Sequence, residues 1–238
     1  MGFQTALAAA LAFGVVGDIL YDGPHRAKPG VLKGTAANIV VGRYFTLDAS
    51  DGQYAPGGTG KDGGILSNPK ALQSIGTSAG GPLAPTLVVP AGTVGEFTDM
   101  GMMVVALTNG CNIGDLVQYA HADGTLKAQG PVVSFTGEIA VTTGVLTVTA
   151  MTAGSPPIAV GMTLTGTGVP GGTVITALGT GTGGTGTYQT NIVTAVASTT
   201  MTSASVPDAG YSFIPGARVV RQANASAGIT CVSLTGPL

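Results

Sequence analysis

The sequence predicts an all-β protein, and three observations carry that prediction. Short runs of Val, Ile, Leu and Thr alternate with a period of two residues, as in half-buried strands. Turn signals separate these runs at regular spacing, in a chain that contains 40 Gly and 14 Pro residues. Only residues 5–13 have a composition that favours a helix, and the following Gly14 limits it to a short one. Strands spaced in this way predict a sandwich or barrel.

The composition excludes disorder and predicts an assembled protein. The chain has 44% hydrophobic residues and a formal net charge of −2, whereas disorder needs low hydrophobicity and high net charge. The apolar stretch from Ala6 to Val16 is shorter than the roughly 20 residues of a transmembrane helix. No Lys or Arg precedes it, as a secretory signal would require, so we expect a buried N-terminal segment. Because charged residues make up only 8% of the chain, we expect its surface to be covered by neighbouring subunits.

Charge is unevenly distributed along the chain, and this divides it into domains. Every Lys and Arg lies outside residues 128–217, and Glu138 is the only charged residue from Val132 to Ser205. We therefore expect a Thr/Gly-rich β-module of about six short strands at residues 132–205. It would be inserted into a second β-domain formed by residues 1–131 and 206–238, in which the Pro- and Gly-punctuated residues 1–36 form an extended arm.

Individual strands follow from the same alternation. In the flanking domain we expect strands within Asn38–Leu47, Thr86–Pro90, Met102–Leu107, Asp115–Ala120, Arg218–Gln222 and Gly228–Leu234. A hairpin turn is expected at Asp123–Gly124. In the module we expect strands within Glu138–Ala150, which turns at a Gly, and within Met162–Gly166, Gly172–Leu178, Gly186–Thr190 and Thr200–Ser203.

The titratable residues give little support to an enzyme. Either His25 or His121 could act as a general base, but neither has a catalytic partner at a helpful spacing. We therefore expect both to be loop histidines, and we expect no catalytic residue. Glu138 is alone in its module and cannot form the carboxylate pair of a glycosidase.

Metal and nucleotide sites are also disfavoured. A group of aspartates suggests a calcium loop, but the regular spacing of such a loop is absent and Asx-turns explain them better; these are Asp18, Asp22, Asp48, Asp51 and Asp62. The Gly-rich run Gly179–Tyr188 lacks the Lys and the following helix of a phosphate loop, so we expect a flexible hairpin connection. Cys111 and Cys231 are too few for a zinc site, and small core residues are favoured over a disulfide. We expect no cofactor.

Basic residues are too sparse for a nucleic-acid interface. Arg26, Lys28 and Lys33 form the only tight basic group. A solvated arm is one interpretation of this group, and docking onto an acidic neighbouring surface is the other.

Five short motifs together resemble the structural cement (decoration) proteins of tailed-phage capsids. They are residues 1–8, Gly17–Asp18, Val41–Phe45, Thr86–Gly92 and Asn112–Leu126, and they cover roughly residues 1–130. The resemblance implies a jelly-roll-like β-barrel that coats the outside of the head, made in the bacterial cytoplasm. It also implies a dimer or trimer that bridges major capsid protein subunits, so Arg26, Lys28 and Lys33 become candidate capsid contacts. The inserted module departs from the shorter members of that family, and long insertions at a hairpin tip cost little loop entropy.

Two other functions remain open at this stage. The module could be a virion-surface adhesin for glycans, although it contains only Phe135 and Tyr188 as aromatic residues. The chain could also be a tail-associated structural protein, but neither β-helical repeats nor a carboxylate cluster is visible in it.

Overall fold

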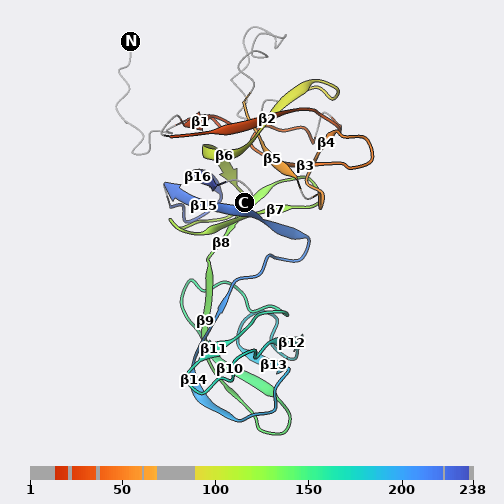
Figure 1. The fold of residues 1–238 in the computed structure, drawn as a ribbon. Helices are drawn as coiled ribbons and strands as arrows, with labels where there is room; N and C mark the ends of the chain where they lie inside the picture. Colours follow the sequence, from red (N-terminus) through yellow and green to blue (C-terminus); the bar gives the residue numbers. More distant parts are fainter. Residues whose placement is uncertain are drawn as a thin grey trace, which may run out of the picture. The chain divides into compact units, whose positions relative to one another are not determined.

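The structure, a computed structural model, describes residues 14–20, 23–35, 38–60, 62–68, 89–221 and 223–235 (Figure 1). Within these ranges it contains strands and no helix, and the predicted all-β class with a jelly-roll-like barrel or sandwich is confirmed. The chain divides into two compact units. Unit 1 comprises residues 1–113, 117–128 and 210–238, and unit 2 comprises residues 114–116 and 129–209.

The strands of unit 1 lie at both ends of the chain, and those of unit 2 lie between them. The first group is β1 (Ile19–Leu20), β2 (Arg26–Val31), β3 (Tyr44–Leu47), β4 (Tyr54–Pro56), β5 (Gly63–Leu66), β6 (Val94–Leu107), β7 (Leu116–Ala120), β8 (Leu126–Gln129), β15 (Tyr211–Arg221) and β16 (Gly228–Thr235). The second group is β9 (Val132–Ile139), β10 (Val145–Met151), β11 (Thr165–Gly166), β12 (Ile175–Leu178), β13 (Gly186–Thr190) and β14 (Val196–Ala204).

Strand β6 is the common wall of two rings of strands in unit 1. One ring runs β6, β5, β3, β4 and β2, and it closes because Leu32, directly after β2, bridges to Tyr54 of β4. The other runs β6, β16, β15, β7 and β8, and it closes through the parallel pairing of Leu107 with Leu126. Each closure is a single bridged pair, so within the described residues the outer side of β2 itself is left without a strand partner.

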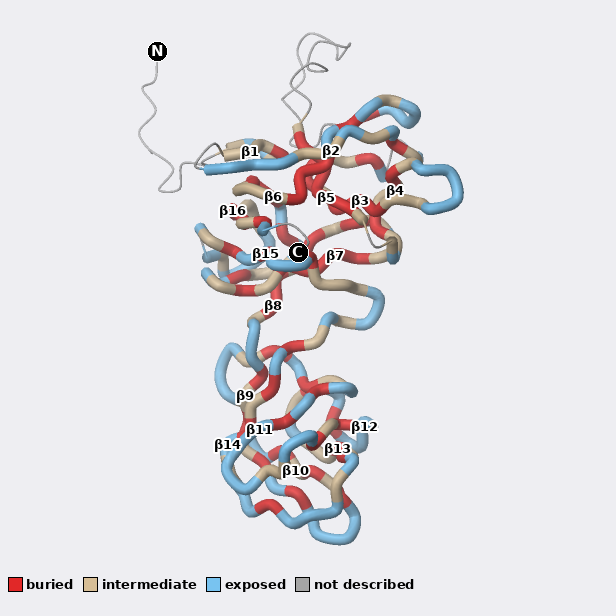
Figure 2. Tube along the Cα trace, in the orientation of Figure 1, coloured by how far each residue is buried: buried red, intermediate tan, exposed pale blue. Residues whose placement is uncertain are grey.

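Unit 1 has two hydrophobic clusters, which Figure 2 shows as the buried stretches of the trace. One is built around Phe97, whose ring contacts those of Phe45 and Tyr54, and it also includes Leu32, Ile39, Val41, Leu66 and Val89. The larger cluster includes Met103, Val105, Val117, Val219 and Val232. Both clusters draw on β6, so this strand is the central element of the unit.

Unit 2 is a six-stranded sheet with the order β11-β14-β9-β10-β13-β12. The sheet curls back on itself, because Met162 and Leu164 pair with the backbone of Ile175 and Thr173 just before β11 begins. A separate core fills it, and its largest buried members are Phe135, Leu146, Met162 and Tyr188. Six strands, β9 to β14, lie in this unit, where about six were expected, but β9 spans Val132–Ile139 whereas the first predicted strand begins at Glu138.

Several strands differ from the predicted ranges. The strand expected within Asn38–Leu47 begins only at Tyr44, because residues 41–43 form a turn in which Gly42 has a φ of +80°. Val89 and Pro90 are not in a strand, and the rest of the predicted Thr86–Pro90 strand lies outside the described residues. The expected helix at residues 5–13 also lies outside them.

The expected extended arm is corrected in its described part. Residues 26–31 are strand β2, which pairs antiparallel with β6 of the same chain, and Ile19–Leu20 pair with Met102–Met103. Backbone pairing with β6 makes this segment part of unit 1. Several Pro and Gly residues of the 23–35 segment therefore lie in or beside an edge strand, a position in which these residue types are tolerated.

Candidate interaction surface

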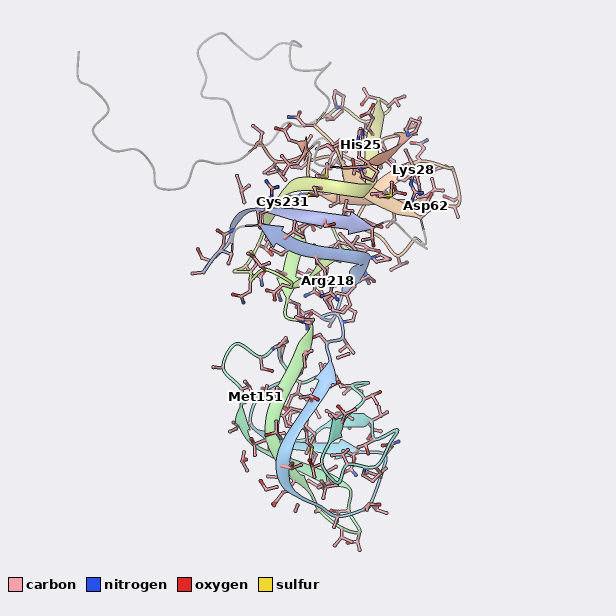
Figure 3. The ribbon with its side chains drawn as sticks, turned by 60° about the vertical axis from the view of Figure 1, so that its left-hand side comes forward. His25, Lys28, Asp62, Met151, Arg218 and Cys231 are labelled. Atoms are coloured by element: carbon pink, nitrogen blue, oxygen red, sulfur yellow. The ribbon has the colours of Figure 1, made fainter. Side chains whose placement is uncertain are left out.

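The basic group of the sequence forms a network of ion pairs along β2. The guanidinium of Arg26 donates to both carboxylate oxygens of Asp99, with Nε–Oδ1 at 2.7 Å and Nη2–Oδ2 at 2.9 Å. The Nζ atom of Lys28 lies 2.5 Å from Oδ1 of Asp62 and 3.0 Å from Oδ2 of Asp99. Figure 3 shows Lys28 and Asp62 close together in unit 1. Asp99 thus connects the two cations, and its side chain is only 4% exposed.

A β-bulge explains why Asp99 lies between these two cations. Arg26 pairs with Met100 and Ala27 pairs with Thr98, so Asp99 is the extra residue of β6 at this step. Such a residue has no direct cross-strand partner, and a bulge redirects its side chain. The buried carboxylate then requires partners, which Arg26 and Lys28 supply from the neighbouring strand.

The network shifts the pKa values of its members. Burial raises the pKa of Asp99, but the hydrogen bonds from Arg26 and Lys28 outweigh burial and hold the pKa below its usual range. The hydrogen bond to Asp62 is the main cause of the raised pKa of Lys28. The charges of Arg26, Lys28 and Asp99 therefore persist at neutral pH.

Acid is expected to weaken this network. Because the pKa of Asp99 is lower in the folded than in the unfolded chain, its stabilising contribution is present above about pH 4 and is lost as the pH falls through the folded value. The free energy of unfolding, measured by urea titration between pH 7 and pH 3, should fall less in Asp99→Asn than in the unmodified protein. Glu138→Gln, an exposed position in unit 2, is the control and should follow the unmodified protein. An identical pH profile for Asp99→Asn would contradict this assignment.

Lys33 is held by a second pair of carboxylates. Its Nζ atom lies 2.7 Å from an oxygen of Asp48 and 2.7 Å from one of Asp51, and these contacts raise its pKa to about 12. The other oxygen of each aspartate accepts a backbone N–H two residues later, from Ser50 and Gln53. Asp48 and Asp51 therefore form the Asx-turns that the sequence predicts.

Each candidate capsid-contact residue thus has a carboxylate of its own chain beside it. Arg26, Lys28 and Lys33 hold β2 and the 48–53 loop in place, and their charges are compensated within unit 1. A contact between these residues and another subunit stays a prediction. Because each cation is already paired with an aspartate, these residues would not attract an acidic surface as unpaired cations would. The role of Asp99 could not be predicted from the sequence, because it depends on the register between β2 and β6.

Strand β2 pairs with β6 along one side, and within the described residues no strand pairs with its other side before the bridge from Leu32 to Tyr54. Leu32 donates its N–H to Thr93 and accepts from Gly92, so its backbone faces β6. Alternate residues face the same way in an antiparallel ladder, so Ala27 and Pro29 face outward. Pro29 has no N–H, and its outward position costs no bond to β6.

Two apolar side chains lie at the end of this edge. Val31 of β2 is directly opposite Val94 of β6, and they are 38% and 63% exposed. A cross-strand pair of exposed valines beside a strand edge is a small apolar surface on a rigid ladder. We call Ala27, Pro29, Val31 and Val94 the β2 edge surface.

A second polar cluster lies where β7 meets β15. Nε2 of His121 is 2.8 Å from the hydroxyl of Ser212, which also hydrogen-bonds to Tyr119. The backbone of His121 donates to Gly210 and accepts from Gly58. These contacts join three segments of unit 1. In the described part of the chain, no carboxylate hydrogen-bonds to the imidazole of His121. The cluster therefore serves as a structural tie.

The remaining sequence candidates have structural partners. Asp18 accepts from the N–H of Val15 and from Asn68, and Asp22 lies outside the described residues. Cys111 and Cys231 are buried core residues that form no disulfide with each other, as predicted. The Gly179–Tyr188 run is not a loose connection: Gly183 donates to the Tyr188 hydroxyl, which itself donates to Gly184. The described residues contain no group of three His, Cys, Asp or Glu side chains that could hold a metal ion.

Comparison with known proteins adds no family. No protein-family model matches the chain, and no curated protein matches it. No helix within the described ranges is long and apolar enough to cross a membrane.

Proposed function

We propose that this protein is a capsid cement, or decoration, protein of a tailed phage. It would bind the outer surface of the head and bridge neighbouring major capsid protein subunits as a dimer or trimer. It would work without a catalytic site and without binding nucleic acid or a membrane. The motifs at residues 1–8, 17–18, 41–45, 86–92 and 112–126 support this proposal, and so does the all-β barrel character of unit 1.

The observation that carries the proposal is the β2 edge surface. Its backbone edge accepts an added strand, which is a common way for β-proteins to join a partner. The cations of β2 are compensated by Asp99 and Asp62, so docking does not require the burial of an unpaired charge. Val31 and Val94 supply the apolar contact that interface centres favour over charged residues.

Repetition would make a small contact effective. A standard interface buries about 1,600 Å² in total, and a single edge strand supplies only part of it. An oligomer that engages several capsid subunits at once gains avidity, because the second contact forms within an already bound complex. A bridging protein of this kind would stabilise the seams between shell subunits against internal pressure.

The test uses expanded phage shells that lack the protein. Addition of the purified chain should produce stoichiometric binding, seen by co-sedimentation, and should raise the temperature at which the shells release their contents. Absence of binding together with unchanged shell stability would refute the proposal.

A pair of variants tests the β2 edge surface itself. Val94→Asp should weaken co-sedimentation about tenfold or more, because it places a charge in the apolar contact. Ile113→Asp is the matched control, since Ile113 is 65% exposed on the same unit but lies in the turn before β7. Equal binding by both variants would show that the shell contact lies elsewhere.

A further inference from the structure

One face of the unit 2 sheet is an ordered array of hydroxyl groups. Thr136 of β9 lies opposite Thr200 of β14, and Thr147 of β10 lies opposite Thr187 of β13. Ser134 lies opposite Thr202, which in turn lies opposite Thr165 of β11. We call these seven side chains the hydroxyl face: Ser134, Thr136, Thr147, Thr165, Thr187, Thr200 and Thr202.

The sheet itself fixes which side these residues occupy. Along β9, Val133, Phe135 and Ile139 are buried in the core, so Ser134, Thr136 and Glu138 point to the other side. Along β14, Met201 and Ser203 are buried while Thr200 and Thr202 are not. All seven residues of the hydroxyl face are exposed or half-buried. They therefore remain accessible on the outer side of a packed sheet.

The hydroxyl groups are pre-ordered for binding. Neighbouring strands lie about 4.8 Å apart and alternate residues about 6.7 Å apart, so the hydroxyls form a regular grid. Thr is stiff at χ1, and little rotamer entropy is lost when such a side chain binds. Four of the seven hydroxyls already hydrogen-bond within unit 2: Thr165 contacts Thr202 at 3.0 Å, Ser134 accepts from Thr152, and Thr187 contacts Thr180. The ligand contacts therefore fall chiefly to Thr136, Thr147 and Thr200.

The charge pattern selects the ligand. No Lys or Arg occurs in residues 128–217, so the face offers no cation to an acidic polymer. Its one neighbouring charge is Glu138, which is exposed opposite Thr147 and can accept two hydroxyl hydrogens. Phe135 and Tyr188 are buried in the core, so recognition must rest on hydrogen bonds and not on aromatic stacking. Hydroxyls both donate and accept, which complements a polymer that also carries only hydroxyls.

We infer that the hydroxyl face binds neutral polysaccharide. Glu138 fixes one sugar, and the threonines hydrogen-bond its neighbours along the polymer while their methyl groups pack against sugar C–H groups. Each contact is weak, and repetition along the polymer supplies the affinity. This activity is independent of shell binding, which we assign to unit 1.

The test is affinity electrophoresis of the full chain in native gels that contain dextran, mannan or galactan. At least one of these polymers should slow the protein. The triple variant Thr136→Val, Thr147→Val and Thr200→Val replaces hydroxyl by methyl at nearly constant shape and keeps a strand-favouring residue. It should weaken binding about tenfold or more. Thr182→Val, an exposed threonine in the 179–185 loop, is the control and should bind like the unmodified chain.

The outcomes separate cleanly when thermal unfolding shows that all variants are folded. Retardation by a neutral polymer that the triple variant loses and the control keeps supports the inference. Migration unaffected by all three neutral polymers overturns it, and so does retardation that the triple variant retains. Equal retardation by the acidic polymer alginate would overturn the charge argument. Shell co-sedimentation of the triple variant should be unchanged, which distinguishes failure of this inference from failure of the cement proposal.

Discussion

Phe97→Ala is expected to lower the free energy of unfolding of unit 1 by about 3–5 kcal/mol. Phe97 is fully buried, and its ring stacks on Tyr54 at 4.1 Å and contacts Phe45 at 5.5 Å. Its strand position also pairs with Lys28 of β2 on one side and Leu66 of β5 on the other. Removal of the ring leaves a cavity at the point where three strands meet.

Urea unfolding followed by circular dichroism measures this effect. Val94→Ala is the control, because Val94 is on the same strand with an exposed side chain, and its free energy of unfolding should change by less than about 0.5 kcal/mol. A Phe97→Ala variant as stable as Val94→Ala would show that the Phe45, Tyr54 and Phe97 cluster does not organise the unit.

Tyr188→Ala is expected to have an effect of similar size in unit 2, about 3–5 kcal/mol. Tyr188 is 1% exposed, and its hydroxyl accepts from Gly183 at 3.0 Å and donates to Gly184 at 2.6 Å. The substitution therefore removes a large core side chain and also releases the backbone of the 179–185 loop. Hydrogen exchange should report faster amide exchange in β9, β10 and β13.

Tyr188→Phe separates the two contributions. It keeps the ring but leaves the Gly183 N–H and the Gly184 carbonyl without their partner, at an expected cost of about 1–3 kcal/mol. Because the core of unit 2 shares no residue with the two clusters of unit 1, exchange in β3, β6 and β16 should stay unchanged in both variants. Faster exchange in those strands would contradict the separation of the cores.

The alternation of apolar and polar residues was sufficient to predict the fold class, because strand pleating imposes it directly. The Asp-Gly turn signal predicted the hairpin at Asp123–Gly124, where Gly124 has a φ of +73° and lies between β7 and β8. The alternation was less informative elsewhere. It failed for the first half of β6, where Gly95, Asp99 and Gly101 interrupt the pattern. Asp99 is a bulge residue whose partners come from β2. The sequence of β6 alone does not indicate which residues of another strand will pair with it.

The same limit applies to the candidate interaction surface. The sequence drew attention to Arg26, Lys28 and Lys33 because they are the only clustered cations. It could not reveal that Asp62 and Asp99 neutralise the first two, and that Asp48 and Asp51 neutralise Lys33. The pairing joins positions 34 and 73 residues apart. The sequence showed only that this region is rich in Thr. Which threonines of the hydroxyl face lie opposite one another depends on the register between β9 and β14.

The pairing of Val132 with Ala204 has a practical consequence. The polypeptide enters and leaves the β9–β14 ladder at directly opposed residues, whose Cα atoms are separated by about one strand spacing, 4.5–5.5 Å. A replacement domain needs only closely spaced termini to be spliced in at this point, and a two-residue turn would suffice to join the ends after excision. The junction is therefore suited to use as a cassette site, at which one domain could be exchanged for another.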